Sequence, residues 1–301
     1  MAMTSGSVPF AIDGPSLSPV HDAVASGPSA IELVALAVGL AMVLVGVAGV
    51  LAYVRDADAR IERELRELAA ERDAYREFAE RVSALRVTQG TTAMATPQTV
   101  QTAHEPGPPV EAVESAFEET VMAVDHYERT YGEPWLAHLQ AELAPEIAAT
   151  LAETAVVNAP LKRALEQRAL EAAGKRDDLL ALLSTERAAV ADAEDSLATI
   201  QKRLEALDDG PLSERSFDDL AGTHDALDDL STDVQEVASR RQRQIHRETR
   251  SGRFDAENLT VQEYLYGSLP AAYPVLDATV QLADRIDAAK RRVRTALTAT
   301  V

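Results

Sequence analysis

Two tyrosine-containing motifs carry the residue types in this sequence that are best suited to acid–base chemistry. The first contains His126, Tyr127, Tyr131, Gly132 and Glu133, and the second contains Glu263, Tyr264, Tyr266, Gly267 and Tyr273. Histidine and carboxylate side chains around a small aromatic pocket can exchange protons with a ligand. The alternative interpretation is structural: tyrosine hydroxyls satisfy buried loop backbone, and Gly132 and Gly267 end helices. We favour the structural interpretation and predict no catalytic residue.

A run of basic residues stands out in an otherwise acidic chain. Arg240, Arg241 and Arg243 begin this run, which continues to Arg253. Clustered arginines can bind phosphate groups or anionic lipid headgroups. However, no aromatic residues are interleaved with these arginines, and cations near a helix C-terminus are also stabilised by the helix dipole. Contact with nucleic acid or lipid is therefore the less favoured interpretation.

The sequence lacks the patterns that identify common cofactor and metal sites. It contains no cysteine, which excludes disulfides, thiol catalysis and cysteine-bound zinc. The acidic cluster that begins at Asp218 has neither the ligand spacing nor the turn glycine of a calcium-binding loop. Dinucleotide-binding, metalloprotease and nucleophile-elbow motifs do not occur. We therefore expect no cofactor, no metal and no enzymatic activity.

The composition limits the kinds of partner. The chain has 301 residues and a formal net charge of -20, which repels phosphate overall, so nucleic acid is not the expected partner. Abundant acidic residues with few lysines are typical of halophilic proteins. In molar salt the Debye length falls to about 3 Å, so such a surface repels itself little.

The longest apolar stretch determines where we expect the chain to lie. Residues 33–54 carry no charge, and as a helix they would be about 33 Å long, enough to cross a bilayer. We predict a transmembrane helix over residues 30–54. Residues 1–29 contain no lysine or arginine, whereas Arg55 and Arg60 follow the span. This asymmetry predicts a single-pass protein of the cell membrane, with its N-terminus outside and its C-terminal domain in the cytoplasm.

The other segments follow from composition and periodicity. We predict a disordered extracytoplasmic tail over residues 1–29, a juxtamembrane coiled coil over residues 55–86 and a disordered linker over residues 87–109. Residues 110–301 form the predicted helical domain. The juxtamembrane seam needs a partner, which is either a second copy of the same helix or the C-terminal helices of the same chain.

A long antiparallel coiled-coil hairpin over residues 161–247 is the main element of this domain. Residues 161–207 and 217–247 each place seam residues at alternating spacings of three and four. The turn around Gly210 is short, so the two helices must be antiparallel. A third seam follows Pro274. The predicted fold class is all-α, with the transmembrane helix, the juxtamembrane coiled coil, the linker and a C-terminal domain built on this hairpin.

Residues 121–134 and 263–276, together with the hairpin, resemble a family of single-span haloarchaeal membrane proteins without an assigned activity. The resemblance covers roughly residues 110–301 and implies no catalytic residue. We interpret the chain as a membrane-anchored, non-enzymatic coiled-coil scaffold whose partner is a second copy or a cytoplasmic protein. The alternative is a membrane tether that binds DNA or anionic lipid through residues 240–253.

Overall fold

The computed structural model describes residues 30–87, 107–251 and 260–299. The predicted tail, most of the predicted linker and Arg253 lie outside these residues. Within them, every regular element is a helix, and the sole β-type contact is an isolated bridge between Pro109 and Val156. The predicted all-helical character is therefore confirmed for the described residues.

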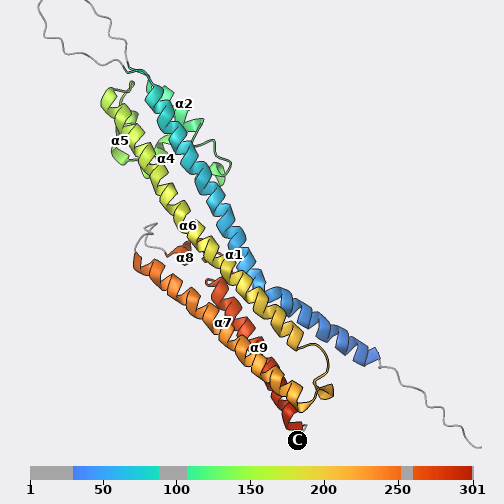
Figure 1. The fold of residues 1–301 in the computed structure, drawn as a ribbon. Coiled ribbons are helices and arrows are strands. Elements are labelled where there is room, and N and C mark those ends of the chain that lie inside the picture. Colours follow the sequence, from blue (N-terminus) through green and yellow to red (C-terminus); the bar gives the residue numbers. More distant parts are fainter. Residues whose placement is uncertain (1–29, 88–106, 252–259, 300–301) are drawn as a thin grey trace, which may run out of the picture. The chain divides into compact units, whose positions relative to one another are not determined.

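The helices are shown in Figure 1. In chain order they are α1 (Ala30–Ala84), α2 (Val110–Glu118), α3 (Tyr127–Thr130), α4 (Trp135–Glu142), α5 (Pro145–Glu153), α6 (Ala159–Leu207), the 3-10 helix η1 (Leu212–Glu214), α7 (Phe217–Ser251), α8 (Val261–Tyr266) and α9 (Pro274–Ala299). The chain separates into a unit over residues 1–47 and a unit over residues 48–301, and the packing described below lies within the second unit.

Local sequence explains where several helices begin and end. The side chain of Asn158 accepts a hydrogen bond from Leu161 N at 2.9 Å and so caps the N-terminus of α6. Thr260 and Glu263 form a capping box at the start of α8. Gly210, in the connection between α6 and α7, has a φ of 83°, a conformation that glycine adopts without strain.

The charged second half of α1 packs on α6 of the same chain. Arg55 pairs with Glu194 at 3.0 Å, and Arg76 pairs with Asp177 at 2.6 Å. The residue number rises along α1 while that of its partner falls along α6, so the two helices are antiparallel. Of the two partners considered for the predicted juxtamembrane seam, the structure therefore shows the chain's own C-terminal region.

Two apolar clusters hold the second unit together. One joins the part of α1 from Val50 to Leu68 to the C-terminal half of α6 and to α7, α8 and α9. The other joins the last turns of α1 to α2, α4, α5 and the N-terminal half of α6. Helix α7 packs against α6 and, more extensively, against α9, which lies beside it in Figure 1. Each long helix thus buries its apolar stripe against neighbours in the same chain.

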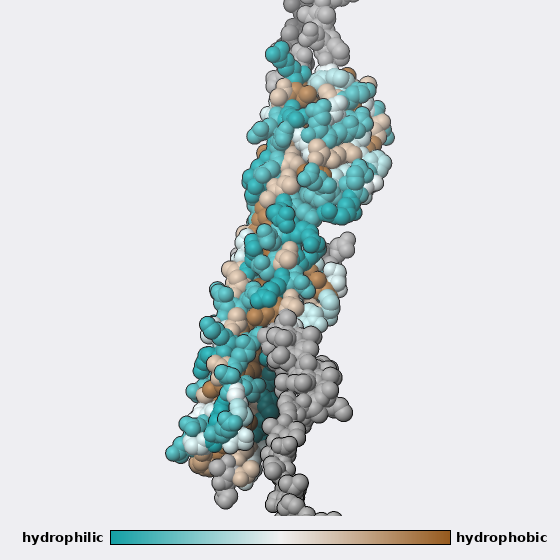
Figure 2. Space-filling view, turned by 90° about the vertical axis from the view of Figure 1, so that its right-hand side faces the viewer, coloured by the Kyte–Doolittle hydropathy of each residue, from teal (hydrophilic) through white to brown (hydrophobic). Residues whose placement is uncertain are grey.

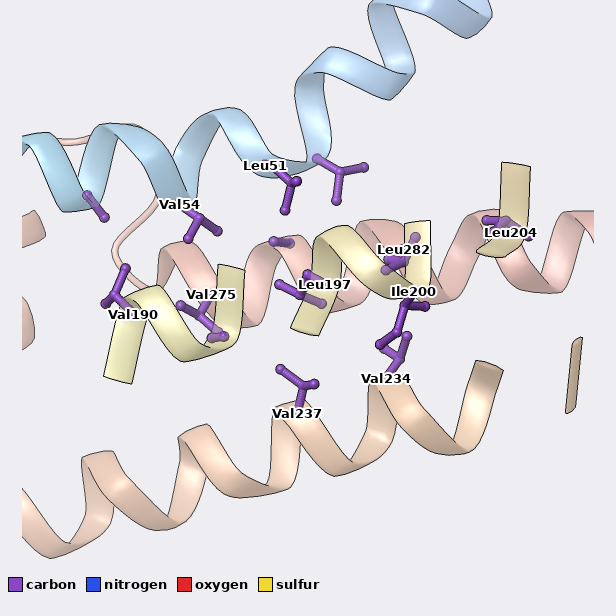
Figure 3. Close-up of a cluster of buried hydrophobic side chains, with 14 of the residues drawn as sticks. Leu51, Val54, Val190, Leu197, Ile200, Leu204, Val234, Val237, Val275 and Leu282 are labelled. Carbon is purple, nitrogen blue, oxygen red and sulfur yellow. The ribbon is translucent and has the colours of Figure 1, made fainter. Parts of the chain in front are cut away.

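The predicted transmembrane helix over residues 30–54 is wrong. Among the residues that the structure describes, none of the helices combines the length and the apolar character needed to cross a bilayer. Val50, Leu51 and Val54, at the end of the proposed span, are buried in the protein core. They belong to the same cluster as Leu197 and Leu282 (Figure 3). Burial against other helices removes apolar surface from water, so an uncharged run does not by itself identify a membrane span.

Candidate functional site

The residues best suited to chemistry are gathered around buried carboxylates between the long helices. Arg176 and Glu186 occupy positions in the apolar seam of α6, and Arg241 occupies a seam position in α7. All three are buried. A buried charge is costly unless it is paired and hydrogen-bonded, so each of these residues requires specific partners.

The first cluster is centred on Glu71 of α1. Its Oε1 accepts hydrogen bonds from His126 Nε2 at 2.9 Å and from the Tyr131 hydroxyl at 2.9 Å. Its Oε2 accepts a hydrogen bond from Arg176 Nε at 3.0 Å. Arg176 also donates to Glu142 Oε2 at 2.7 Å, so that it bridges α1 and α4 from its position on α6. The Glu71 carboxylate therefore joins α1 to α6 and to the first tyrosine motif, and Arg176 extends the cluster to α4.

The environment of Glu71 keeps it ionised. Burial raises the pKa of its carboxyl group, but the hydrogen bond from His126, the charge of Arg176 and the Tyr131 hydroxyl together outweigh burial. The net effect is a pKa below the ordinary value for glutamate. Burial and the neighbouring Glu71 charge raise the pKa of Tyr131, which therefore stays protonated as a donor.

His138 of α4 lies beside this cluster. Its Nε2 is 3.0 Å from the Tyr75 hydroxyl, and its Nδ1 is 3.2 Å from Glu133. The Tyr131 ring meets the His138 ring edge to face, with centroids 4.5 Å apart. Burial lowers the pKa of His138, and the nearby Glu142 and Glu133 only partly oppose this effect, so the ring is neutral at pH 7. The guanidinium of Arg176 lies 4.8 Å from the centre of the Tyr75 ring, within cation–π range.

The second cluster is centred on Glu186 of α6. Arg241 donates to both of its oxygens, at 2.8 and 2.5 Å, and the Tyr266 hydroxyl donates to Oε1 at 2.6 Å. Gln244 adds a longer hydrogen bond at 3.3 Å. Burial raises the pKa of Tyr266, and the charge of Glu186 adds to this effect. The bidentate pair joins α6 to α7, and the tyrosine attaches α8 to both.

The two tyrosine motifs do not form one pocket. Tyr264 donates to Glu64 of α1, whereas Tyr131 donates to Glu71, seven residues or about two helical turns further along the helix. Tyr266 belongs to the Glu186 cluster, and Tyr273 is 46 % exposed. The structure thus distributes the predicted site residues over separate contacts.

The first motif also satisfies backbone as the structural interpretation requires. The Tyr127 hydroxyl donates to the carbonyl oxygen of Glu133 at 3.0 Å, and burial raises the pKa of this hydroxyl to about 12. Gly132 follows α3 with a φ of 58°, and its N–H donates to Tyr127 O at 3.1 Å. Gly267 is the C-cap residue of α8, where an added Cβ would lie 2.6 Å from Glu263 O.

The basic run beginning at Arg240 is divided between surface and core. Arg240 and Arg243 are exposed, but Arg241 is 4 % exposed and pairs with Glu186. An α-helix turns by about 100° per residue, so adjacent residues in the run point in different directions. Arg241 is therefore a structural residue and does not belong to a surface patch.

The sequence interpretation missed Glu71, Glu142 and His138, the acceptors and neighbours that complete the first cluster. The available signal was the presence of charged residues at seam positions, because a buried charge requires a buried partner of opposite charge.

Among the described residues, no group of three or more histidine or acidic side chains is placed to hold a metal ion. A shallow hollow on α6 near Leu170 is lined by none of the predicted site residues. The chemistry that the clusters support is charge pairing and hydrogen bonding between helices.

These features define a helical protein whose long helices are joined by buried polar clusters. Over residues 52–290 the chain matches the family described as Domain of unknown function (DUF7260), and it belongs to that family. The match confirms the expected membership of a family without an assigned activity, whereas a haloarchaeal source stays a prediction. Comparison with curated proteins and with solved structures found no match.

Proposed function

We propose that the chain is a non-enzymatic interaction module, in which a rigid set of long helices presents charged faces to a protein partner. The main observation in support of this proposal is that the side chains best suited to chemistry form hydrogen bonds with other residues of the same chain. Glu71 and Glu186 each accept hydrogen bonds from an arginine and a tyrosine of the same chain. Groups engaged in this way fix the register of the helices and are not presented to a substrate.

The outer surface fits this role. The described part of the face in Figure 2 is mainly hydrophilic, with scattered apolar residues. Charged faces of this kind steer association and select partners by complementarity rather than by apolar burial. The long helices are held together by their shared apolar core, and partly exposed ion pairs such as Arg187 with Asp58 and Arg203 with Asp233 lie at its edges. A rigid helix is suited to holding a partner at a defined distance and orientation.

A crosslinked pull-down of the full-length tagged chain from native cells tests the proposal, with both protein and DNA measured in the recovered material. We expect a reproducible set of proteins, or the chain itself, without enrichment of DNA. The double substitution His126→Gln and Glu133→Gln should leave the recovered proteins unchanged, because these residues serve internal contacts. Recovery of no protein, or loss of partners in this correctly folded variant, would contradict the proposal.

A second variant separates the nucleic-acid alternative. Arg240→Gln with Arg243→Gln removes two exposed charges and leaves the buried Arg241 in place. DNA enriched with the wild-type chain and lost with this variant would favour nucleic-acid binding through the basic run. Enrichment of proteins alone would favour the interaction module.

A further inference from the structure

One face of α7 remains exposed along its whole length. Its residues recur at spacings of three and four, which places them on one side of the helix. They are Asp218, Gly222, Asp225, Asp229, Thr232, Glu236, Arg240, Arg243, Arg247 and Arg250, and all are exposed. We name this set the α7 outer face. The opposite side of α7 packs on α6 and α9 through residues such as Leu227 and Val234.

The α7 outer face is divided sharply by charge. Its N-terminal half, up to Glu236, contains acidic residues and no basic residue, whereas its C-terminal half, from Arg240, contains arginine alone. Within the described parts of the chain, none of these charged side chains has an ion-pair partner. By contrast, other charged residues of α7, such as Asp228, Asp233 and Arg241, pair with α9 or α6. The α7 outer face therefore retains charge that the described residues do not neutralise.

We propose that the α7 outer face binds the α7 outer face of a second copy of this chain in an antiparallel arrangement. The charge order is self-complementary about a two-fold axis near the middle of the helix. In one register, Asp218 faces Arg250, Asp225 faces Arg243, and Asp229 faces Arg240. The two-fold axis repeats each pair, so one register pairs three of the four charges in each half with an opposite charge.

The remaining positions fit the same register. Gly222 faces Arg247, and an added Cβ at Gly222 meets no atom within 4 Å, so this position leaves room for a long side chain. Thr232 faces Glu236 near the axis, where the hydroxyl can donate to the carboxylate.

A second copy explains the whole face better than other occupants do. Nucleic acid would meet the arginine half but would be repelled by the acidic half. A second copy in the parallel orientation would place like charges opposite each other.

This inference rests on the proposed function, because it names one partner of the interaction module. Exposed ion pairs are weak and are screened by salt, so the dimer should dissociate readily as ionic strength rises.

Sedimentation velocity of the full-length chain at low and high salt tests the inference with two charge-reversed variants. The acid-only variant, which is acidic at all six positions of the three charge pairs, carries Arg240→Glu, Arg243→Glu and Arg250→Glu. The base-only variant, which is basic at the same six positions, carries Asp218→Arg, Asp225→Arg and Asp229→Arg. We expect the wild-type chain to dimerise at low salt and each variant alone to dimerise at least tenfold more weakly. An equal mixture of the two variants should form a heterodimer, because every reversed pair is again complementary.

A matched control carries Arg63→Glu, Arg66→Glu and Arg291→Glu, exposed residues of α1 and α9 that give the same change in net charge as the acid-only variant. The control should dimerise like the wild type, and circular dichroism should show native helicity for every variant.

Three results would overturn the inference: a monomeric wild type, self-association that survives charge reversal, or a mixture of the two variants that stays monomeric. Monomeric wild type that binds duplex DNA through the arginines would assign the face to nucleic acid instead. Other proteins recovered in the pull-down would leave the proposed function intact even if dimerisation failed.

Discussion

Replacing Arg241 by methionine removes the cation that neutralises Glu186 in the core between α6 and α7. Glu186 is 0 % exposed, and Arg241 supplies two of its four side-chain hydrogen bonds. The substitution leaves Tyr266 and Gln244 as the remaining donors. Loss of one partner of a buried ion pair lowers the free energy of unfolding by about 3–5 kcal/mol, because the other charge stays buried and unpaired.

Further substitutions at the same cluster should recover part of this loss. Glu186→Met combined with Arg241→Met removes both charges, and the remaining cost is the unpaired Tyr266 hydroxyl, about 1–3 kcal/mol. Adding Tyr266→Phe removes that hydroxyl as well, so the triple variant should be close to the wild type in stability. Among these three variants, stability should therefore rise with the number of substitutions.

Urea denaturation followed by far-ultraviolet circular dichroism measures these free energies, and urea leaves the electrostatic contribution unscreened. The double-mutant cycle isolates the interaction between Glu186 and Arg241. A loss below about 1 kcal/mol for Arg241→Met, or additive effects of the two single substitutions, would refute a strongly coupled buried pair.

Three further predictions concern pH and local geometry. Burial lowers the pKa of His138 from its ordinary value of 6.5. Below about pH 6.5 the unfolded chain therefore binds a proton at this residue that the folded chain does not bind. The free energy of unfolding should fall as the pH drops below about 6.5. Urea titrations of the wild type and His138→Gln at pH 7.5 and 5.5 measure this effect, and an equal pH dependence in the two proteins would disprove it. Asn158→Ala removes the α6 cap and should cost about 1 kcal/mol, whereas the exposed Glu153→Ala should cost less; equal losses would argue against capping. Gly132→Ala should cost about 1–2 kcal/mol, because alanine disfavours a φ of 58°, and an unchanged unfolding midpoint would show that the turn relaxes.

Local periodicity predicted many of the positions at which the long helices bury side chains, although Phe217, a seam position of α7, is 51 % exposed. In α6, the seam positions Leu183, Val190 and Leu197 are all buried, and in α9 so are Leu282 and Ile286. These positions follow from the geometry of a single helix, which repeats about every 3.6 residues. The sequence therefore contains enough information to orient each helix face.

Partners distant in sequence could not be predicted in this way. Glu71 and Arg176 are 105 residues apart, and no local pattern specifies that their helices cross at this point. At the end of the uncharged run, Val50, Leu51 and Val54 are buried among helices of the protein, and a protein core imposes the same apolar requirement as a lipid core, so composition alone does not separate the two. Arg241 was grouped with its neighbours because a run of like residues conceals the rotation of the helix.

Helix α1 packs on α6 of the same chain in a single antiparallel register, with the Glu71–Arg176 pair between them. The chain contains no cysteine, so Arg76→Cys with Asp177→Cys introduces one unique pair. The measurement is crosslinking of this variant with a short bismaleimide in a mixture of isotopically light and heavy chains, followed by mass spectrometry of the linked peptides. We expect linked peptides from one chain, all light or all heavy, at every protein concentration. Mixed light–heavy pairs as the main product would show instead that α1 packs on another molecule.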